Sequence, residues 1–159
     1  MGVLYDYFRA PDDEAVAQLM AETDGGPIMG EAGATDLDVV DGKGIDPSVV
    51  LGQVVAFALD VPWAADLIGE RLAWPQDVAQ DPEYEGPWVV LLSERIRDAL
   101  AEISDERMPG LAERWSRIEE LSHYSDTGPE AMLSCLQEFV GLARRARASC
   151  EGIYCWICL

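Results

Sequence analysis

Short apolar runs separated by proline and glycine mark the first part of the chain. Residues 2–9 are aromatic and β-branched and stop before Pro11, which predicts a strand. Acidic residues follow Pro11 directly and complement the positive end of a helix, so a helix is predicted from there to about Thr23. Residues 24–46 are glycine-rich and acidic, with one apolar patch. They predict a long loop with room for one short strand.

The middle of the chain alternates between apolar helices and short strands. Asp46 is a predicted helix cap, and the apolar run that follows it to about Ala58 predicts a helix near the centre of the fold. Three shorter segments come next: a predicted helix, an extended segment and an apolar run typical of a strand covered on both faces, at residues 62–69, 71–74 and 88–92. An acidic loop, residues 75–87, connects the last two.

Three helical patterns and a strand make up the rest of the chain. Ser93 is predicted to cap the first helix, whose apolar residues recur at spacings of three and four up to Ile103. The other two helices are predicted at about residues 105–121 and 129–148. Residues 153–159 contain no charge and are apolar on both alternating faces, so we expect this strand inside the sheet rather than at its edge.

These elements predict one α+β domain over residues 1–159. It consists of a small mixed β-sheet packed with four to six helices, and the sheet holds the N-terminal strand and the strands near 71–74, 88–92 and 153–159. The composition agrees with a single core, because 49% of the residues are hydrophobic, which excludes a disordered chain.

The charge is the unusual property of the composition. The chain carries 30 acidic residues against 11 Lys and Arg, a formal net charge of −19. This charge excludes a conventional nucleic-acid binder, which needs a basic face, and a protein that docks electrostatically on anionic membranes. Neither a signal peptide nor a membrane span is predicted, so we expect a soluble cytoplasmic protein with reduced thiols. The oligomeric state is left open.

No catalytic signature is found among the chemically reactive residues. Cys155 and Cys158 form the only Cys-X-X-Cys, but residues three apart on a strand point to opposite faces, so we expect structural thiols rather than a metal or redox pair. His123 is the only histidine, and its position at a helix end favours a surface role. We therefore predict no cofactor and no metal site, and leave an enzymatic function uncertain.

The aspartates of the first loop do not have the spacing of a calcium-binding loop. Counted from Asp36, Asp41 stands where an EF-hand needs glycine and Pro47 stands where it needs glutamate. The sequence Gly42-Lys43-Gly44 also lacks the spacing of a phosphate-binding loop. A weak, solvated site for a divalent ion stays open as an alternative.

The negative charge is concentrated in the part of the chain that holds the two long loops. Residues 1–92 have a charge balance of −15 and residues 93–159 a balance of −4. Acidic loops flanked by tryptophan would steer and anchor a basic protein partner. The predicted partner-binding residues are Trp74, Asp77, Asp81, Glu83, Glu85 and Trp88 at the second loop, and Asp36, Asp38 and Asp41 at the first. The alternative is that these loops only confer solubility.

The order of the elements resembles that of the YfbM-like family of small uncharacterised bacterial proteins. The shared features are a Met-Gly strand ending in Arg, an acidic helix, an Asp-initiated apolar helix, a Gly-Pro strand that runs into a capped helix, an Ile-Ser-Asp-Glu helix start, and a long helix before an apolar strand. Apart from the acidic helix, they lie at residues 1–9, 45–59, 86–103, 103–106 and 129–159. The resemblance implies an α+β fold and no active residues.

Three functional hypotheses follow from the sequence. The first is a module that binds a basic protein through its acidic, Trp-flanked loops, as an immunity protein or inhibitor does. The alternative is a small enzyme or small-molecule binder with a pocket near the 24–46 loop, in which His123 or loop carboxylates act as acid and base. The third is a metal or redox site at Cys155 and Cys158.

Overall fold

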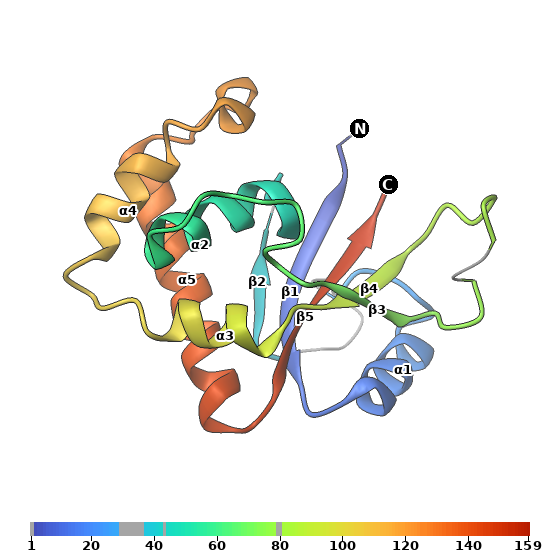
Figure 1. Cartoon of the computed structure of the whole chain (residues 1–159). Coiled ribbons are helices and arrows are strands. Elements are labelled where there is room, and N and C mark those ends of the chain that lie inside the picture. The colour runs from blue at the N-terminus through green and yellow to red at the C-terminus, as the bar shows by residue number, and fades with distance from the viewer. Residues whose placement is uncertain (1, 29–36, 43, 79–80) are drawn as a thin grey trace.

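The computed structural model describes residues 2–28, 37–42, 44–78 and 81–159, which form a sheet with helices on both faces (Figure 1). The described elements are β1 (Leu4–Ala10), α1 (Asp13–Glu22), β2 (Val39–Asp41), the π-helical segment η1 (Pro47–Leu51), α2 (Gly52–Leu59), β3 (Arg71–Trp74), β4 (Trp88–Leu91), α3 (Glu94–Ala101), α4 (Met108–Trp115), the 3-10 helix η2 (Glu119–His123), α5 (Pro129–Ala148) and β5 (Gly152–Cys158). The α+β class is confirmed.

Strand β5 lies in the middle of a five-stranded sheet of order β2-β1-β5-β4-β3. It pairs with β1 over its whole length, from Gly152 opposite Ala10 to Cys158 opposite Leu4, and with β4 on its other side. The predicted interior position of this strand is therefore confirmed. All four described strand pairings are antiparallel, so in this respect the sheet differs from the mixed sheet that we predicted.

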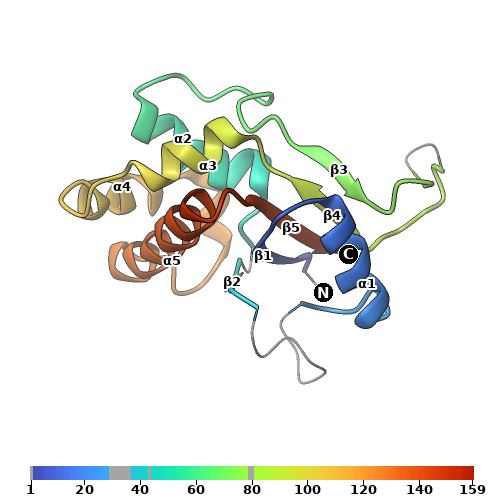
Figure 2. The ribbon, with the colours of Figure 1, turned by 90° about the horizontal axis from the view of Figure 1, so that it is seen from below.

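The two faces of the sheet are covered by two separate apolar clusters. Helices α2 to α5 gather on one face and α1 lies on the other (Figures 1 and 2). The side chains of β5 alternate between these clusters: Ile153 and Cys155 belong to the cluster on the side of α2 to α5, and Tyr154 and Trp156 belong to the cluster beneath α1. A strand that is apolar on both faces is thus buried on both faces.

Two predicted helices are corrected by the structure. Residues 62–69 form turns rather than a helix, because α2 ends at Asp60 in a left-handed conformation and the indole of Trp63 donates a hydrogen bond of 2.9 Å to the carbonyl of Ser48. The helix expected over 105–121 is present only as α4. Ile118 adopts an extended conformation that breaks it, although Ile118 itself stays buried as the apolar pattern predicts.

The two predicted caps, Asp46 and Ser93, behave differently. The carboxylate of Asp46 accepts hydrogen bonds from the backbone N–H groups of Ser48, Val49 and Val50 at 2.8–3.1 Å. Ser93 occupies the cap position of α3, but its side chain makes no capping hydrogen bond. Asp46 therefore stabilises the start of its helix through its side chain, whereas Ser93 does not.

We predict that Asp46→Ala lowers the free energy of unfolding by about 1–2 kcal/mol, because backbone donors at the start of η1 lose their acceptor. The matched change Ser93→Ala is expected to stay within about 0.5 kcal/mol of the parent protein. Urea denaturation followed by circular dichroism measures both values. Equal losses for the two variants would contradict the difference between the two caps.

Candidate functional site

The structure separates the two predicted acidic loops. The described end of the first loop continues into β2, at one edge of the sheet, whereas the 75–87 connection joins β3 and β4 at the opposite edge. Asp36 lies outside the described residues, and Asp41 is exposed at the end of β2. The described parts of the two loops therefore lie at opposite edges of the sheet.

Asp38 is held by two arginines. Its carboxylate accepts a hydrogen bond of 2.9 Å from Nε of Arg9, and both Nε and a terminal nitrogen of Arg145 also donate to it. The hydrogen bond from Arg145, and then that from Arg9, lower the pKa of Asp38 below its usual range. Asp38 thus connects β1, α5 and the segment before β2, and its charge is compensated within the protein.

The described carboxylates of the 75–87 connection, in contrast, are exposed. Figure 1 shows this connection reaching outward from the sheet. The carboxylates are those of Asp77, Asp81, Glu83 and Glu85, and none forms an ion pair with a cation in the described part of the chain. We call these four residues the acidic arm.

Local hydrogen bonds shape the part of the connection from residue 81 to residue 87. The carboxylate of Asp81 accepts from the backbone N–H of Glu83 at 3.0 Å, and the hydroxyl of Tyr84 donates to the carbonyl of Pro87 at 2.8 Å. Gly86 has a φ of +93°, and a Cβ there would lie 2.7 Å from the ring of Trp88. Glycine is required at this position on both grounds.

Trp74 and Trp88 do not form a pair of anchors, because they lie on opposite faces of the sheet. Trp74 packs against the cluster beneath α1. Val89 belongs to the same cluster, so the preceding residue, Trp88, points to the other face. The ring of Trp88 meets that of Tyr84 edge to face, at a centroid distance of 5.8 Å. Only Trp88 therefore shares a face with the helices α2 to α5.

The same face carries an aromatic pocket that the sequence analysis missed. It has a volume of about 280 Å³ and is lined in part by Tyr5, Tyr124, Asp46 and Glu120. Burial and then the nearby Asp46 carboxylate raise the pKa of Tyr5 to about 12, so the phenol stays neutral at physiological pH. The sequence predicted a strand over residues 2–9, but it did not show which elements of the fold contact Tyr5.

Register connects this pocket to the arm. Tyr5 and Trp88 are both paired with Ile157 of β5, one from each side. Residues paired in this way share a face, and neighbouring strands are about 4.8 Å apart. Tyr5, Ile157 and Trp88 thus form a row across three strands, which we call the aromatic row. The aromatic pocket lies at its Tyr5 end, and the acidic arm lies beyond its Trp88 end.

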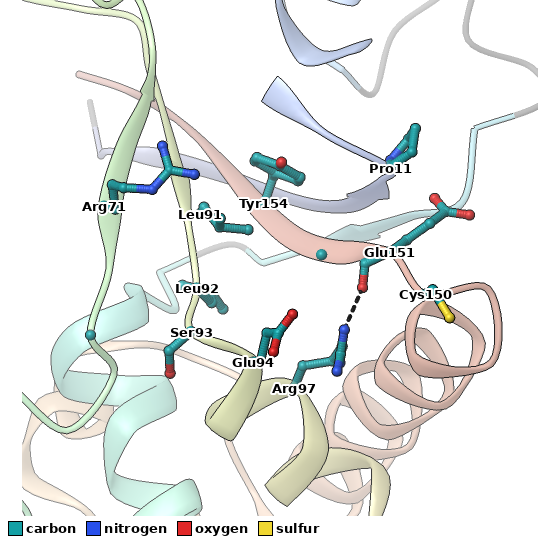
Figure 3. A pocket seen from close by; sticks show the side chains of 12 residues that line it. Pro11, Arg71, Leu91, Leu92, Ser93, Glu94, Arg97, Cys150, Glu151 and Tyr154 are labelled. Atoms are coloured by element: carbon teal, nitrogen blue, oxygen red, sulfur yellow. Dashed lines mark hydrogen bonds between the residues drawn. The ribbon is translucent and has the colours of Figure 1, made fainter. Parts of the chain in front are cut away.

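A second cavity of about 320 Å³ lies where β3, β4 and β5 meet the start of α3 (Figure 3). Arg71 enters from β3 and Arg97 from α3, with Glu94 beside Arg97. Apolar groups of Pro11, Leu91 and Leu92 and the ring of Tyr154 form much of the remaining wall. None of these residues stands out in the sequence as a ligand-binding residue, because they come from four separate stretches of the chain.

Both arginines of this cavity are anchored. Arg71 donates to both carboxylate oxygens of Asp13, at 2.7 and 3.2 Å, and Tyr154 donates to the same carboxylate at 2.9 Å. These bonds lower the pKa of Asp13, the one from Arg71 most strongly. Arg97 donates from Nε to Asp98 at 2.9 Å and from a terminal nitrogen to the carbonyl of Glu151 at 3.0 Å. The two guanidinium groups are therefore fixed in position.

The remaining chemical candidates are dispersed. Cys155 and Cys158 point to opposite faces as predicted, and burial raises the pKa of Cys155 well above its usual value. His123 is exposed at the end of η2. Across residues 2–28, 37–42, 44–78 and 81–159, no group of three or more His, Cys, Asp or Glu side chains is arranged to hold a metal ion, and no helix is long and apolar enough to cross a membrane.

A pocket also borders the described end of the 24–46 loop. It has a volume of about 270 Å³ and includes Leu37, Asp38 and Arg9 among its lining residues. Its charged groups are occupied with one another, because Arg9 donates to both Asp38 and Glu151.

Comparison of the chain with protein-family models, with curated proteins and with solved structures finds no match. The similarity to the YfbM-like family therefore stays a prediction from the order of the elements.

We predict that Asp38→Asn lowers the free energy of unfolding by about 1–2 kcal/mol at pH 7, since two arginines lose a charged acceptor. A carboxyl with a lowered native pKa stabilises the fold above its unfolded pKa of about 3.9 and loses that contribution as pH falls. The variant should thus lose less stability below about pH 4 than the parent does. Urea titrations at several pH values measure this.

The control for Asp38→Asn is Asp77→Asn, which removes an exposed arm carboxylate that has no described ion pair. It should change stability by less than about 0.5 kcal/mol. An Asp38→Asn protein with the stability and acid response of the parent would contradict the structural role of Asp38.

Proposed function

We propose that this protein is a protein-binding module that engages a basic segment of a partner through the acidic arm and the neighbouring aromatic row. The observation that carries the proposal is that the four arm carboxylates are exposed and have no described cation partner, although arginines elsewhere pair with carboxylates such as Asp38 and Asp13. Unpaired, clustered carboxylates are the complement of a basic surface.

The net charge supports this function through long-range attraction. A formal charge of −19 attracts a basic protein, and the balance of −15 over residues 1–92 places most of that charge in the part of the chain that contains the arm. Attraction of this kind mainly accelerates association and weakens as salt is added. It does not by itself give a lasting complex.

Trp88, at one end of the aromatic row, and Tyr84, whose ring packs against it, supply the short-range part of the interaction. Trp88 and Tyr84 are only partly buried and lie next to arm residues Glu83 and Glu85. Partly exposed aromatic side chains are frequent anchors in interfaces, and their rings also attract arginine guanidinium groups. A module with these properties can cover the basic site of its partner, as inhibitors of the immunity type do.

The test uses a fluorescently labelled arginine-rich peptide and a variant with the arm neutralised, Asp77→Asn, Asp81→Asn, Glu83→Gln and Glu85→Gln. We expect the variant to bind about 30-fold more weakly, because each exposed ion pair contributes about 0.5 kcal/mol. Fluorescence anisotropy measures the dissociation constants, and rising salt should weaken the binding of the parent protein.

The matched control removes the same amount of charge elsewhere. It neutralises four exposed glutamates of the helices and their connections, Glu106, Glu119, Glu130 and Glu138. If the peptide is held at the arm, this control binds nearly as tightly as the parent. Equal weakening in both variants would show that only the net charge matters, and no binding by the parent would contradict the proposed function outright.

A further inference from the structure

We propose that the cavity at the start of α3 binds a small zwitterion, an α-amino acid with an apolar side chain. Its carboxylate accepts from the guanidinium group of Arg97, and its ammonium group faces Glu94, which lies beside Arg97 in the cavity. This ligand site is distinct from the acidic arm and goes beyond the proposed protein-binding function.

Arg97 provides donors in a largely covered position. Only 12% of its side chain is exposed. Two of its nitrogens donate to Asp98 and to the carbonyl of Glu151, and its other terminal nitrogen has no acceptor among the described residues. A guanidinium has five N–H donors, so Arg97 keeps donors for a ligand while its existing bonds hold it in place.

Arg71 bounds the cavity on the side opposite Arg97 and is itself held in place. Its two terminal nitrogens bind Asp13, and Asp13 in turn accepts from Tyr154, while Nε of Arg71 has no acceptor in the described part of the chain. Figure 3 shows the guanidinium reaching over the cavity toward Tyr154. Prior fixation of such a group reduces the entropy cost of binding.

The charges around the cavity favour a zwitterion over a simple anion. Asp13 and Asp98 partly neutralise the two arginines. Glu94 adds a carboxylate at the cavity that forms no ion pair with a described cation, and it would repel a ligand that carries only negative charge. A ligand with one negative and one positive group can pair with an arginine and with the Glu94 carboxylate at the same time.

The size and the apolar walls define the rest of the ligand. A volume of about 320 Å³ is at the lower end of small-molecule sites, which span about 300–1,000 Å³. Pro11, Leu91 and Leu92 offer an apolar surface between the charged groups. These features suit a single amino acid with a side chain such as that of leucine.

The test compares three probes of similar size by isothermal titration calorimetry: leucine, isopentylamine, which lacks the carboxylate, and 4-methylpentanoate, which lacks the ammonium group. We expect leucine to bind with a dissociation constant of about 1 mM or lower. The other two should bind at least about tenfold more weakly, since each leaves one charged side chain of the cavity without a partner.

Variants of the parent protein locate the binding. Glu94→Gln and Arg97→Gln should each weaken leucine binding about tenfold. Arg95→Gln is the matched control, because Arg95 is exposed, precedes Ile96 on the same helix turn and does not line the cavity. Glu94 is also exposed, so its substitution leaves the fold intact and keeps the test decisive if Arg97→Gln destabilises the protein.

Each remaining outcome overturns the inference. Binding of 4-methylpentanoate as tight as that of leucine would indicate an anion site, and tight binding of isopentylamine would indicate a cation site. Absence of leucine binding, or unchanged binding in Glu94→Gln, would show that the cavity does not act as proposed. Since the peptide assay does not involve these residues, failure here leaves the proposed function of the arm separately testable.

Discussion

The burial of β5 is the constraint on which the rest of the structure depends. Its residues are apolar on both faces and flanked by strands on both sides, so both faces of the sheet must be covered. The chain meets this requirement with helices of unequal number: α1 covers one face, and α2 to α5 cover the other. Hydrogen bonds from Tyr7 to the carbonyl of Ile45 and from Trp115 to that of Val50 satisfy polar groups within the larger layer.

The described carboxylates around this core occur in two different arrangements, paired with arginine and unpaired. Where strands and helices meet, arginine pairs with carboxylate: Arg9, Asp38, Arg145 and Glu151 bring together β1, α5 and the chain segments beside them. In the arm, carboxylates stand without described cation partners. The first arrangement stabilises the fold through charged hydrogen bonds, whereas the second raises repulsion within the protein and is not compensated by a described cation. Several of the few arginines thus pair with carboxylates at contacts between elements, whereas the carboxylates of the arm have no described cation partner.

Local patterns predicted the elements well and their contacts poorly. Helix α5 and strand β3 have the predicted bounds because their apolar spacing and proline signals are local. The helix predicted at residues 62–69 was wrong, because a hydrogen bond from Trp63 to Ser48, 15 positions away in the sequence, decides the conformation of this segment. The contacts of the candidate site were harder to predict than the elements. The opposite faces of Trp74 and Trp88 follow from the β3–β4 register, and the ion pair between Asp38 and Arg145 joins residues 107 positions apart. Sequence reveals alternation along a strand, but not which neighbours the strand will have.

Strand β5 also determines how the two proposed sites relate to each other. Ile157, near one end, lies between Tyr5 and Trp88 in the aromatic row, while Gly152 and Tyr154, near the other end, line the cavity at α3. The seven residues of the strand span about 20 Å at a rise of about 3.3 Å per residue. A strand paired with β1 along this length, and with β4 from Tyr154 to Ile157, does not shift by small steps, so occupation of the cavity has no simple route to the arm. The fold therefore supports two independent sites on one rigid sheet, rather than a ligand-controlled interaction surface.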